Sequence, residues 1–507
     1  MLSRSDAGGG RLASLALVFL TLRLLTWAFL LPPWSGFDEP YHHGLVETYA
    51  DDARWHSFLS VRLPPRLLKR MRDWPLYLDY SNAFAARTYG EERPPDREPI
   101  HDPNYETLQS PAYYFAAGGL LRLLPELDPV DELFLLRGLN AIFAAGVGVL
   151  TLAAARAAGY GSRRAYPILL LGFLPGYALA LVRVSNDASC AVLLSIAFLA
   201  SMTHARRSGG RSWLAGASAG LSPWAKLYGW AAIPGLAWDE IRRRPWNAGT
   251  AAFLGALFLP GLALGWLSWR INGHPISLLE NLRHPGSPSI LAVPWLDDAW
   301  TVIKTQIWMS GMSDIVFPTP VYLLIAAALG YLLLCAIRPG RAIPRTPADR
   351  ISDIVVPIFF FGLALAYFAY RNFALSGGPG GAGGWYLWSM ALPESLLLTW
   401  GAARAPCPRT IFRVTLTVLF VLLIAGDLIL FAEPSGLLIL TTPTHHFRGV
   451  VPAPLSTFLS SFRSSRPAWC AGLAIALAAA SWTAGAIALR RICRDASERS
   501  WKDSLVA

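Results

Sequence analysis

The chain has 507 residues, of which 54% are hydrophobic and only 15% are charged. Apolar runs of about 20 residues recur along it, which excludes a string of soluble domains and predicts an all-α polytopic membrane protein. The net charge of +11 does not indicate nucleic-acid binding, because the arginines cluster at the ends of the apolar runs, as in cytoplasmic loops of membrane proteins.

The first apolar segment runs from Leu12 to Pro33 and is interrupted only by Arg23. Its length and the lack of a small-residue cleavage site favour a retained membrane span over a signal peptide. The five cysteines are scattered and include no CxxC pair, so neither a disulfide framework nor a zinc–thiolate site is indicated.

Ten segments are predicted to span the bilayer. They are 12–33, 133–158, 165–183, 187–204, 246–270, 315–337, 353–371, 385–402, 411–431 and 469–489. Residues 110–125 are short for a crossing, at roughly 1.5 Å of rise per residue. Residues 213–238 contain Pro223 and Lys226 midway, which predicts a broken helix or tight hairpin that is buried in protein or lines a wet cavity.

Short arginine-rich connections set the expected orientation, because such loops stay in the cytoplasm. They lie at 163–164, 206–211, 242–244, 338–345, 404–409 and 490–494. If residues 110–125 do not cross and residues 213–238 return to their own side, five other connections face outward: 34–110, 185–187, 271–314, 372–384 and 432–468. If residues 110–125 do cross, the order of the early helices changes, but the first loop still faces outward. We therefore expect one membrane domain over residues 1–507, with amphipathic helices in the first outer loop.

The segment after the first span carries a dense polar cluster, Phe37-Asp38-Glu39-Pro40-Tyr41-His42-His43. Its proline suits the first turn of a helix, which Asp38 or Glu39 can cap. Helical spacing predicts that Asp38 lies beside His42, and that Glu39 lies beside His43 and Glu47, on a helix at the membrane surface. An aspartate near a histidine there could deprotonate a hydroxyl. A capped helix with solvated charges would show the same pattern, so both interpretations stay open.

Polar residues also mark the end of the first loop. Glu106 and Gln109 precede a segment in which Tyr113 and Tyr114 suit the interfacial aromatic belt. These residues fit either a site or a polar lead-in to a membrane segment.

Two further positions place charge at membrane depth. Arg183, Asn186 and Asp187 form a tight corner between two spans; asparagine and aspartate are natural turn residues, but ionisable groups at that depth usually face a cavity. Lys226 lies among aromatic residues next to Pro223. We interpret it as facing an anionic group inside the bundle, with a lipid-linked phosphate as the natural partner.

Three other motifs carry weaker signals. The segment from Trp308 to Asp314 suits acyl-chain contact or a re-entrant turn. The glycine-rich loop before Trp385 could cradle phosphate with its backbone amides, but no Gly-Lys-Ser or Gly-Lys-Thr sequence ends the loop as in a P-loop. His445 and His446 could bind a metal together with the first loop, although adjacent histidines do not share a helix face.

These motifs follow one another in a definite order. The chain has Asp-Glu-Pro-x-His after the first span, Glu-x-x-Gln-x-Pro-x-Tyr-Tyr entering the next segment, Ser-Asn-Asp at a span junction, a lone intramembrane lysine and Gly-x-Tyr opening a late span. The set resembles the GT-C superfamily of integral membrane glycosyltransferases over about residues 10–430. Within it, the set resembles bacterial relatives of the dolichyl-phosphate-mannose protein mannosyltransferases and the aminoarabinose lipid A transferases.

The resemblance implies a bundle of roughly 11–13 transmembrane helices with interfacial helices in the first outer loop. It implies an inverting transfer from a polyprenyl-phosphate sugar to an envelope glycan, lipid or protein, on the outer face of a bacterial inner (plasma) membrane. The acceptor-activating base maps onto Asp38, with Glu39 beside it, and a further carboxylate maps onto Glu106. Lys226 and Arg183 map onto the groups that hold the donor phosphate, and Asn186, Asp187 and Tyr386 accompany them on the donor side.

One departure concerns the late span. Relatives often carry Gly-Arg-Tyr where this chain has Gly384-Trp385-Tyr386. His42, His43, Lys226 or a divalent metal would then have to supply the charge. The sugar, the acceptor and the metal requirement are not identified by the sequence.

Two other classes of function compete with this one. A transporter or lipid flippase also needs intramembrane charges and broken helices, but it predicts repeated halves, which the sequence does not show. A non-catalytic membrane scaffold would leave Lys226 and Asp187 without a role.

Overall fold

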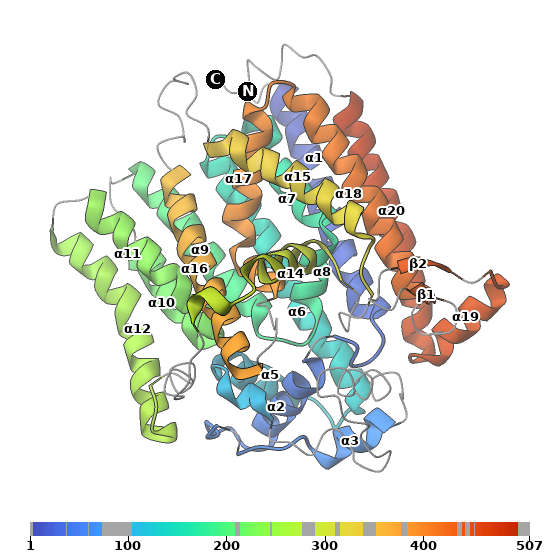
Figure 1. Ribbon diagram of the computed structural model, residues 1–507, viewed down its shortest axis with the longest axis horizontal. Coiled ribbons are helices and arrows are strands. Elements are labelled where there is room, and N and C mark those ends of the chain that lie inside the picture. The colour runs from blue at the N-terminus through green and yellow to red at the C-terminus, as the bar shows by residue number, and fades with distance from the viewer. Residues whose placement is uncertain are drawn as a thin grey trace.

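Helices make up almost all of the computed structural model (Figure 1). It describes residues 4–36, 38–58, 60–72, 104–207, 213–243, 246–275, 289–309, 315–337, 351–376, 383–432, 439–441, 447–450 and 452–494. His445 and His446, Ser310 to Asp314 and the glycines at 377–381 lie outside these residues, so the predictions that rest on them are not addressed.

Six of the described helices are long and apolar enough to cross a membrane. They are α1 (Arg4–Leu30), α6 (Pro129–Ala157), α12 (Ala248–Asn272), α15 (Thr319–Ile337), α18 (Pro408–Ala432) and α20 (Ala468–Arg494). Helices α7 (Tyr166–Phe173) and α8 (Pro175–Val182) meet at an angle of 70° and form either a seventh, broken span or a re-entrant loop. Pro175 lacks the N–H that a continuous helix would need at this break. The chain is thus an integral membrane protein, and the all-α polytopic prediction is confirmed.

Of the remaining predicted spans, two have shorter apolar helical parts, Asp187–Thr203 and Val355–Arg371, and one is interrupted. The segment 187–204 lies in α9 (Asp187–Arg207), 353–371 lies in α16 (Ile351–Ser376), and 385–402 is divided between η7 (Gly384–Met390) and α17 (Ala391–Arg404). The predicted break in 213–238 is present, because α10 (Trp213–Ala225) ends before an extended Lys226 and η3 (Leu227–Ala231) leads into α11 (Ala232–Arg243).

The first loop folds into short helices at the end of the bundle opposite the two chain termini (Figure 1). They are α2 (Glu39–Asp51), α3 (Pro65–Arg72), η1 (Tyr105–Leu108) and α5 (Ala112–Arg122). Helix α5 packs on α2 so closely that a Cβ on Gly118 would lie 2.8 Å from backbone atoms of Tyr49 and Ala50. At 11 residues it is about 16 Å long, which is half of a bilayer core, so it belongs to the loop and does not cross.

The other described elements are short. They are η2 (Gly161–Arg163), η5 (Ile290–Ala292), α14 (Trp295–Ile307), α19 (Leu455–Ser464) and an antiparallel pair of strands, β1 (Ile439–Thr441) and β2 (Phe447–Val450).

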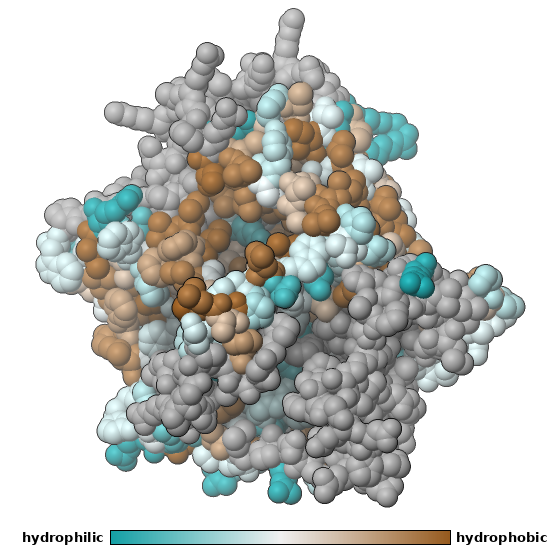
Figure 2. All heavy atoms as spheres, in the orientation of Figure 1, coloured by the Kyte–Doolittle hydropathy of each residue, from teal (hydrophilic) through white to brown (hydrophobic). Residues whose placement is uncertain are grey.

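Hydrophobic residues cover much of the helical face in Figure 2, and hydrophilic residues gather toward its edges. Leucines and aromatic residues of the long helices are exposed, for example Leu262 and Trp266 of α12 and Leu324 of α15. Such a broad exposed apolar surface is expected where lipid chains replace water.

A buried charge pair joins three of the long helices. Arg23 of α1 donates to Asp427 of α18, whose carboxylate also accepts from the indole N–H groups of Trp27, at 2.9 Å, and Trp482 of α20, at 2.8 Å. The side chains of Arg23 and Asp427 are 0% and 2% exposed. The one charged residue within the predicted first span is therefore neutralised inside the bundle.

Asp427→Asn is expected to lower the free energy of unfolding by about 3–5 kcal/mol, because it leaves the buried Arg23 without a counter-charge. Removing both charges in Arg23→Leu/Asp427→Leu should be less harmful, since no unpaired charge remains. Unfolding in mixed detergent–lipid micelles measures both variants. A double variant as unstable as the single one would contradict this account of the pair.

Candidate functional site

Asp38 stands at the beginning of α2 in an unusual backbone conformation. It is the N-cap residue, with φ 60° in the left-handed region, yet its side chain makes no capping hydrogen bond. The half-buried carboxylate instead accepts a short hydrogen bond from the hydroxyl of Tyr105 in η1. Asp38 is thus the predicted N-cap residue, but its carboxylate binds Tyr105 of η1 and does not cap the helix.

Three charged residues meet at the corner between α8 and α9. Lys226 Nζ lies 2.6 Å from one oxygen of Asp187, and Arg183 Nη2 lies 3.1 Å from the other. The hydroxyl of Ser185 donates to Asp187 over 3.0 Å, and all four side chains are buried. The extended Lys226 between α10 and η3 is what brings its ammonium group to this corner.

Aromatic rings enclose the two cations. Lys226 Nζ lies 5.3 Å from the ring centre of Tyr228 and 5.4 Å from that of Tyr386, and the two tyrosine rings are 4.2 Å apart. The guanidinium of Arg183 lies 5.2 Å from the ring centre of Trp385. Such contacts stabilise desolvated cations. Trp385 therefore contacts a basic residue.

Asp38 and this corner belong to one site. Burial raises the pKa of Asp38, while the hydrogen bond from Tyr105 and the positive charges of Arg183 and Lys226 oppose the rise. A Cβ on Gly36 would lie 3.0 Å from the Cβ of Arg183, so the turn before α2 packs directly on the corner. A carboxylate and two cations, which lie 145 and 188 positions farther along the chain, thus share one electrostatic environment.

A second proton network lies beside Asp38. His42 Nδ1 is 2.7 Å from the hydroxyl of Tyr114 and 3.3 Å from Glu106, and Tyr114 donates to Glu106 over 3.3 Å. Burial and then the nearby charge of Asp38 raise the pKa of Glu106 to about 8. Burial and then the charge of Lys226 lower the pKa of His42 well below its usual value. Near pH 7 we therefore expect a neutral histidine and a protonated glutamic acid, which leaves Arg183 and Lys226 as the cations.

Glu39 makes contacts that are separate from those of Asp38. Its carboxylate accepts from Arg137 of α6 at 2.6 and 2.8 Å, and from the backbone N–H groups of Val184 and Gly36. Burial alone would raise the pKa of Glu39, but the charge and hydrogen bonds of Arg137 outweigh it and lower the pKa. Helical spacing placed this carboxylate beside His43 and Glu47, whereas the structure uses it to fasten the start of α2 to α6.

His43 also points elsewhere. Its Nδ1 accepts from the indole N–H of Trp34 over 3.2 Å, and its Nε2 faces Glu132 and Glu47. Most of α2 is buried against other segments of the chain.

Asparagines shape the α8–α9 corner. Asn140 of α6 donates to the backbone carbonyls of Arg183 and Ser185, which holds the corner in place. Asn186 is fully buried, and neither atom of its amide has a hydrogen-bond partner among the described residues. The side chain is thus available to a group that enters the site.

Sequence reasoning missed several residues of this site. Tyr105, Tyr228, Arg137 and Asn140 gave no motif of their own, and only their partners identify them. For Arg137 and Asn140 a signal did exist, since they are polar residues inside a predicted span and such residues face the interior.

Glycines allow α14 to lie against the site. A Cβ on Gly384 would lie 1.8 Å from the carbonyl oxygen of Val302, and one on Gly176 would lie 2.0 Å from that of Gln306. The N–H of Gly384 donates to Thr305. The part of the glycine-rich loop that the structure describes therefore serves close packing of η7 and α8 on α14.

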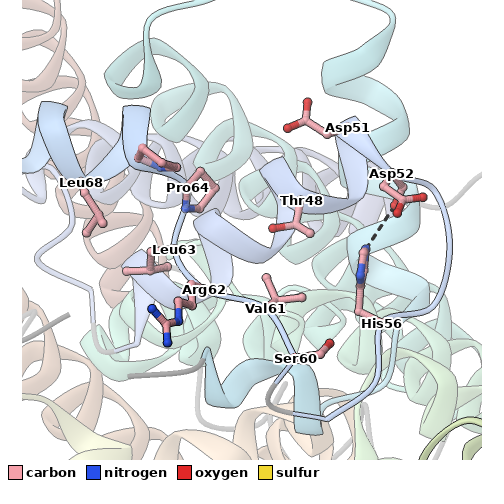
Figure 3. Close-up of a pocket in the computed structure, with 11 residues that line it drawn as sticks. Thr48, Asp51, Asp52, His56, Ser60, Val61, Arg62, Leu63, Pro64 and Leu68 are labelled. Atoms are coloured by element: carbon pink, nitrogen blue, oxygen red, sulfur yellow. Dashed lines mark hydrogen bonds between the residues drawn. The ribbon is translucent and has the colours of Figure 1, made fainter. Parts of the chain in front are cut away.

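A cavity of about 630 Å³ lies at the opposite end of α2 from Asp38 (Figure 3). Thr48, Asp51 and Asp52 line it from the helix, and His56 and Arg62 line it from the segment that follows. The length of α2 separates it from Asp38 by about 18 Å, so it is a separate cavity.

Comparisons of the chain with protein-family models, with curated proteins and with solved structures found no match.

Proposed function

We propose that this chain is a membrane glycosyltransferase that moves a sugar from a polyprenyl-phosphate donor to an envelope acceptor. Two observations carry the proposal: the charges of Arg183 and Lys226 act on the pKa of Asp38, and the turn before α2 packs directly on Arg183. A base and a phosphate-binding pair are the two groups that such a transfer needs most.

In the proposed reaction, Asp38 takes the proton of an acceptor hydroxyl as its oxygen bonds to the anomeric carbon. The bond from that carbon to the phosphate oxygen breaks, and its electron pair leaves with the polyprenyl phosphate, so the configuration inverts. Lys226 and Arg183 stabilise the negative charge that develops on the phosphate. Asp187 balances these cations while the donor is absent, and Tyr105 orients Asp38.

A donor that is anchored in the membrane by its lipid needs a site at membrane depth or at the membrane surface. The corner residues Arg183, Asn186 and Asp187 lie between two apolar helices, and Asp38 follows the first candidate crossing. Trp385, Met309 and Leu179 bring apolar surface next to Arg183, where the first isoprene units would lie. These placements support a lipid-linked donor over a soluble one.

Incubation of purified protein with a radiolabelled polyprenyl-phosphate sugar and crude envelope acceptors tests the proposal. Label on a new product supports transfer. Movement of label across vesicle membranes without a new bond would instead favour a flippase, and neither result would favour a scaffold.

Transfer is expected to have a bell-shaped pH dependence, with a rising limb from Asp38 and a falling limb near pH 8 from Glu106. Above that pH the ionised Glu106 adds a negative charge beside Asp38 and the donor phosphate. Glu106→Gln keeps the shape of the neutral acid, so it should retain transfer near pH 7 and lose the falling limb. Initial rates across the pH range measure this, and an inactive Gln variant at every pH would contradict it.

The same group gives a stability readout. Its folded-state pKa of about 8 is above the usual 4.5, so the folded chain holds a proton that the unfolded chain has lost. Stability from this proton is present below the unfolded pKa and is lost as pH rises toward 8. Glu106→Gln should remove that loss from a series of thermal unfolding curves.

A further inference from the structure

A second polar cluster lies on another face of α2. His43 and Glu47 of α2 and Glu132 of α6 bring three ligand-type atoms within 4.8 Å of one another, and all three residues are buried. His43 Nε2 is 3.3 Å from Glu132 Oε2 and 3.5 Å from Glu47 Oε1, and Glu47 Oε1 has no hydrogen-bond partner among the described residues. Ligands of a tetrahedral zinc ion stand about 3.3 Å apart, so the spacing is that of a zinc site.

The tautomer of His43 opposes zinc binding. The indole N–H of Trp34 can only donate, and it donates to His43 Nδ1 with the two ring planes 16° from parallel. Nδ1 therefore carries a lone pair, and Nε2 of the neutral ring carries the proton. A histidine that binds a metal through Nε2 has its proton on Nδ1, so His43 presents a proton to the two carboxylates and not a lone pair.

Arg66 of α3 supplies the positive charge that the cluster needs. Its Nε lies 3.1 Å from Glu47 Oε2, and its Nη2 lies 2.7 and 2.9 Å from the two oxygens of Glu132. The guanidinium side chain is 41% exposed, whereas the carboxylates are 1% and 5% exposed, so Arg66 reaches the cluster from its solvent side. One planar guanidinium thus bridges two helices, as its geometry allows.

We propose that Arg66 is a positioning residue: its guanidinium is the resident cation of the His43–Glu47–Glu132 cluster, in place of a metal ion, and it fixes α2 against α6. Helix α2 is then attached to α6 at two points, through Glu39 to Arg137 near its start and through Arg66 about 12 Å along its axis. These attachments therefore set the position of Asp38, the N-cap residue of α2. The effect on catalysis rests on the proposed function, but the choice of cation does not.

Zinc content tests the choice of cation without any activity assay. Wild-type protein and Glu132→Gln are exposed to zinc chloride, dialysed and analysed for bound zinc by mass spectrometry. We expect equal amounts of bound zinc in these two proteins. The double variant Trp34→Phe/Arg66→Met should bind more zinc, and adding Glu132→Gln to it should abolish that extra binding. Wild-type protein that holds a zinc ion lost in Glu132→Gln would overturn the assignment, as would a folded double variant that gains none. If the double variant does not fold, the comparison of wild-type protein with Glu132→Gln is sufficient to test the assignment.

Kinetics test the positioning role. Arg66→Gln should lower kcat by about 100-fold with the donor KM unchanged. Arg66→Lys should recover part of the loss. The control Lys69→Gln removes an exposed cation from the same helix and should change neither kcat nor KM. A folded Arg66→Gln variant with wild-type kcat would overturn the role. Absence of transfer by the wild-type protein would refute the proposed function and leave the zinc result standing.

Discussion

Replacing Asp38 with asparagine is expected to reduce sugar transfer by about 10²–10⁴-fold, because the acceptor hydroxyl loses its base. Donor binding should persist or tighten slightly, since the substitution removes a negative charge near the phosphate. Asparagine is the informative choice because it matches the size of aspartate and tolerates the left-handed backbone at this position. Initial rates and donor binding, measured on the same preparation, separate the two effects.

The matched control is Asp51→Asn, which removes an exposed carboxylate from the other end of α2. It should leave transfer and thermal stability unchanged. Full activity of Asp38→Asn would eliminate Asp38 as the base, and a variant that lost donor binding and transfer in equal measure would assign Asp38 to binding.

Lys226→Gln is expected to weaken binding of the polyprenyl-phosphate donor by about 10- to 100-fold, the worth of a hydrogen bond to a charged group. The ammonium group is one of two cations beside Asp187, so its loss leaves Arg183 alone against one carboxylate and the incoming phosphate. Equilibrium binding of a labelled donor analogue in nanodiscs measures the change.

Adding Asp187→Asn to Lys226→Gln frees Arg183 for the phosphate and should recover part of the affinity. Lys69→Gln, on the surface of α3, serves as the control for loss of a lysine. Donor affinity that is unchanged in Lys226→Gln would rule out the phosphate-binding role, whereas recovery in the double variant would show that the charge balance of the corner governs binding.

Local signals account for the parts of this structure that the sequence predicted correctly. Pro223 predicted the break at which Lys226 becomes extended, and the length of the segment 110–125 marked it as short for a crossing. Lys226 and Asp187 were each recognised as ionisable groups at membrane depth, because burying a charge is unfavourable unless something pairs with it. Each of these inferences depends on a few neighbouring residues.

Pairings between distant segments could not be predicted in this way. Glu39 is joined to Arg137, 98 positions along the chain, and helical spacing assigned it other neighbours. The direct pairing of Lys226 with Asp187 and the hydrogen bond from Tyr105 to Asp38 depend on how the helices pack. Periodicity gives the face of a helix but not the partner that covers that face.

The left-handed conformation of Asp38 has a consequence for Glu39. A non-glycine residue in this region stores about 1–3 kcal/mol of backbone strain, which persists only where surrounding contacts hold it. Glu39, the next residue, accepts four hydrogen bonds. One comes from Gly36 within the strained turn, and three come from Val184 and Arg137 in other segments of the chain. If these bonds were lost, the backbone could relax and move the carboxylate of Asp38 away from Tyr105. Glu39 would then be essential to the reaction without exchanging a proton, because its hydrogen bonds hold Asp38 in the strained conformation.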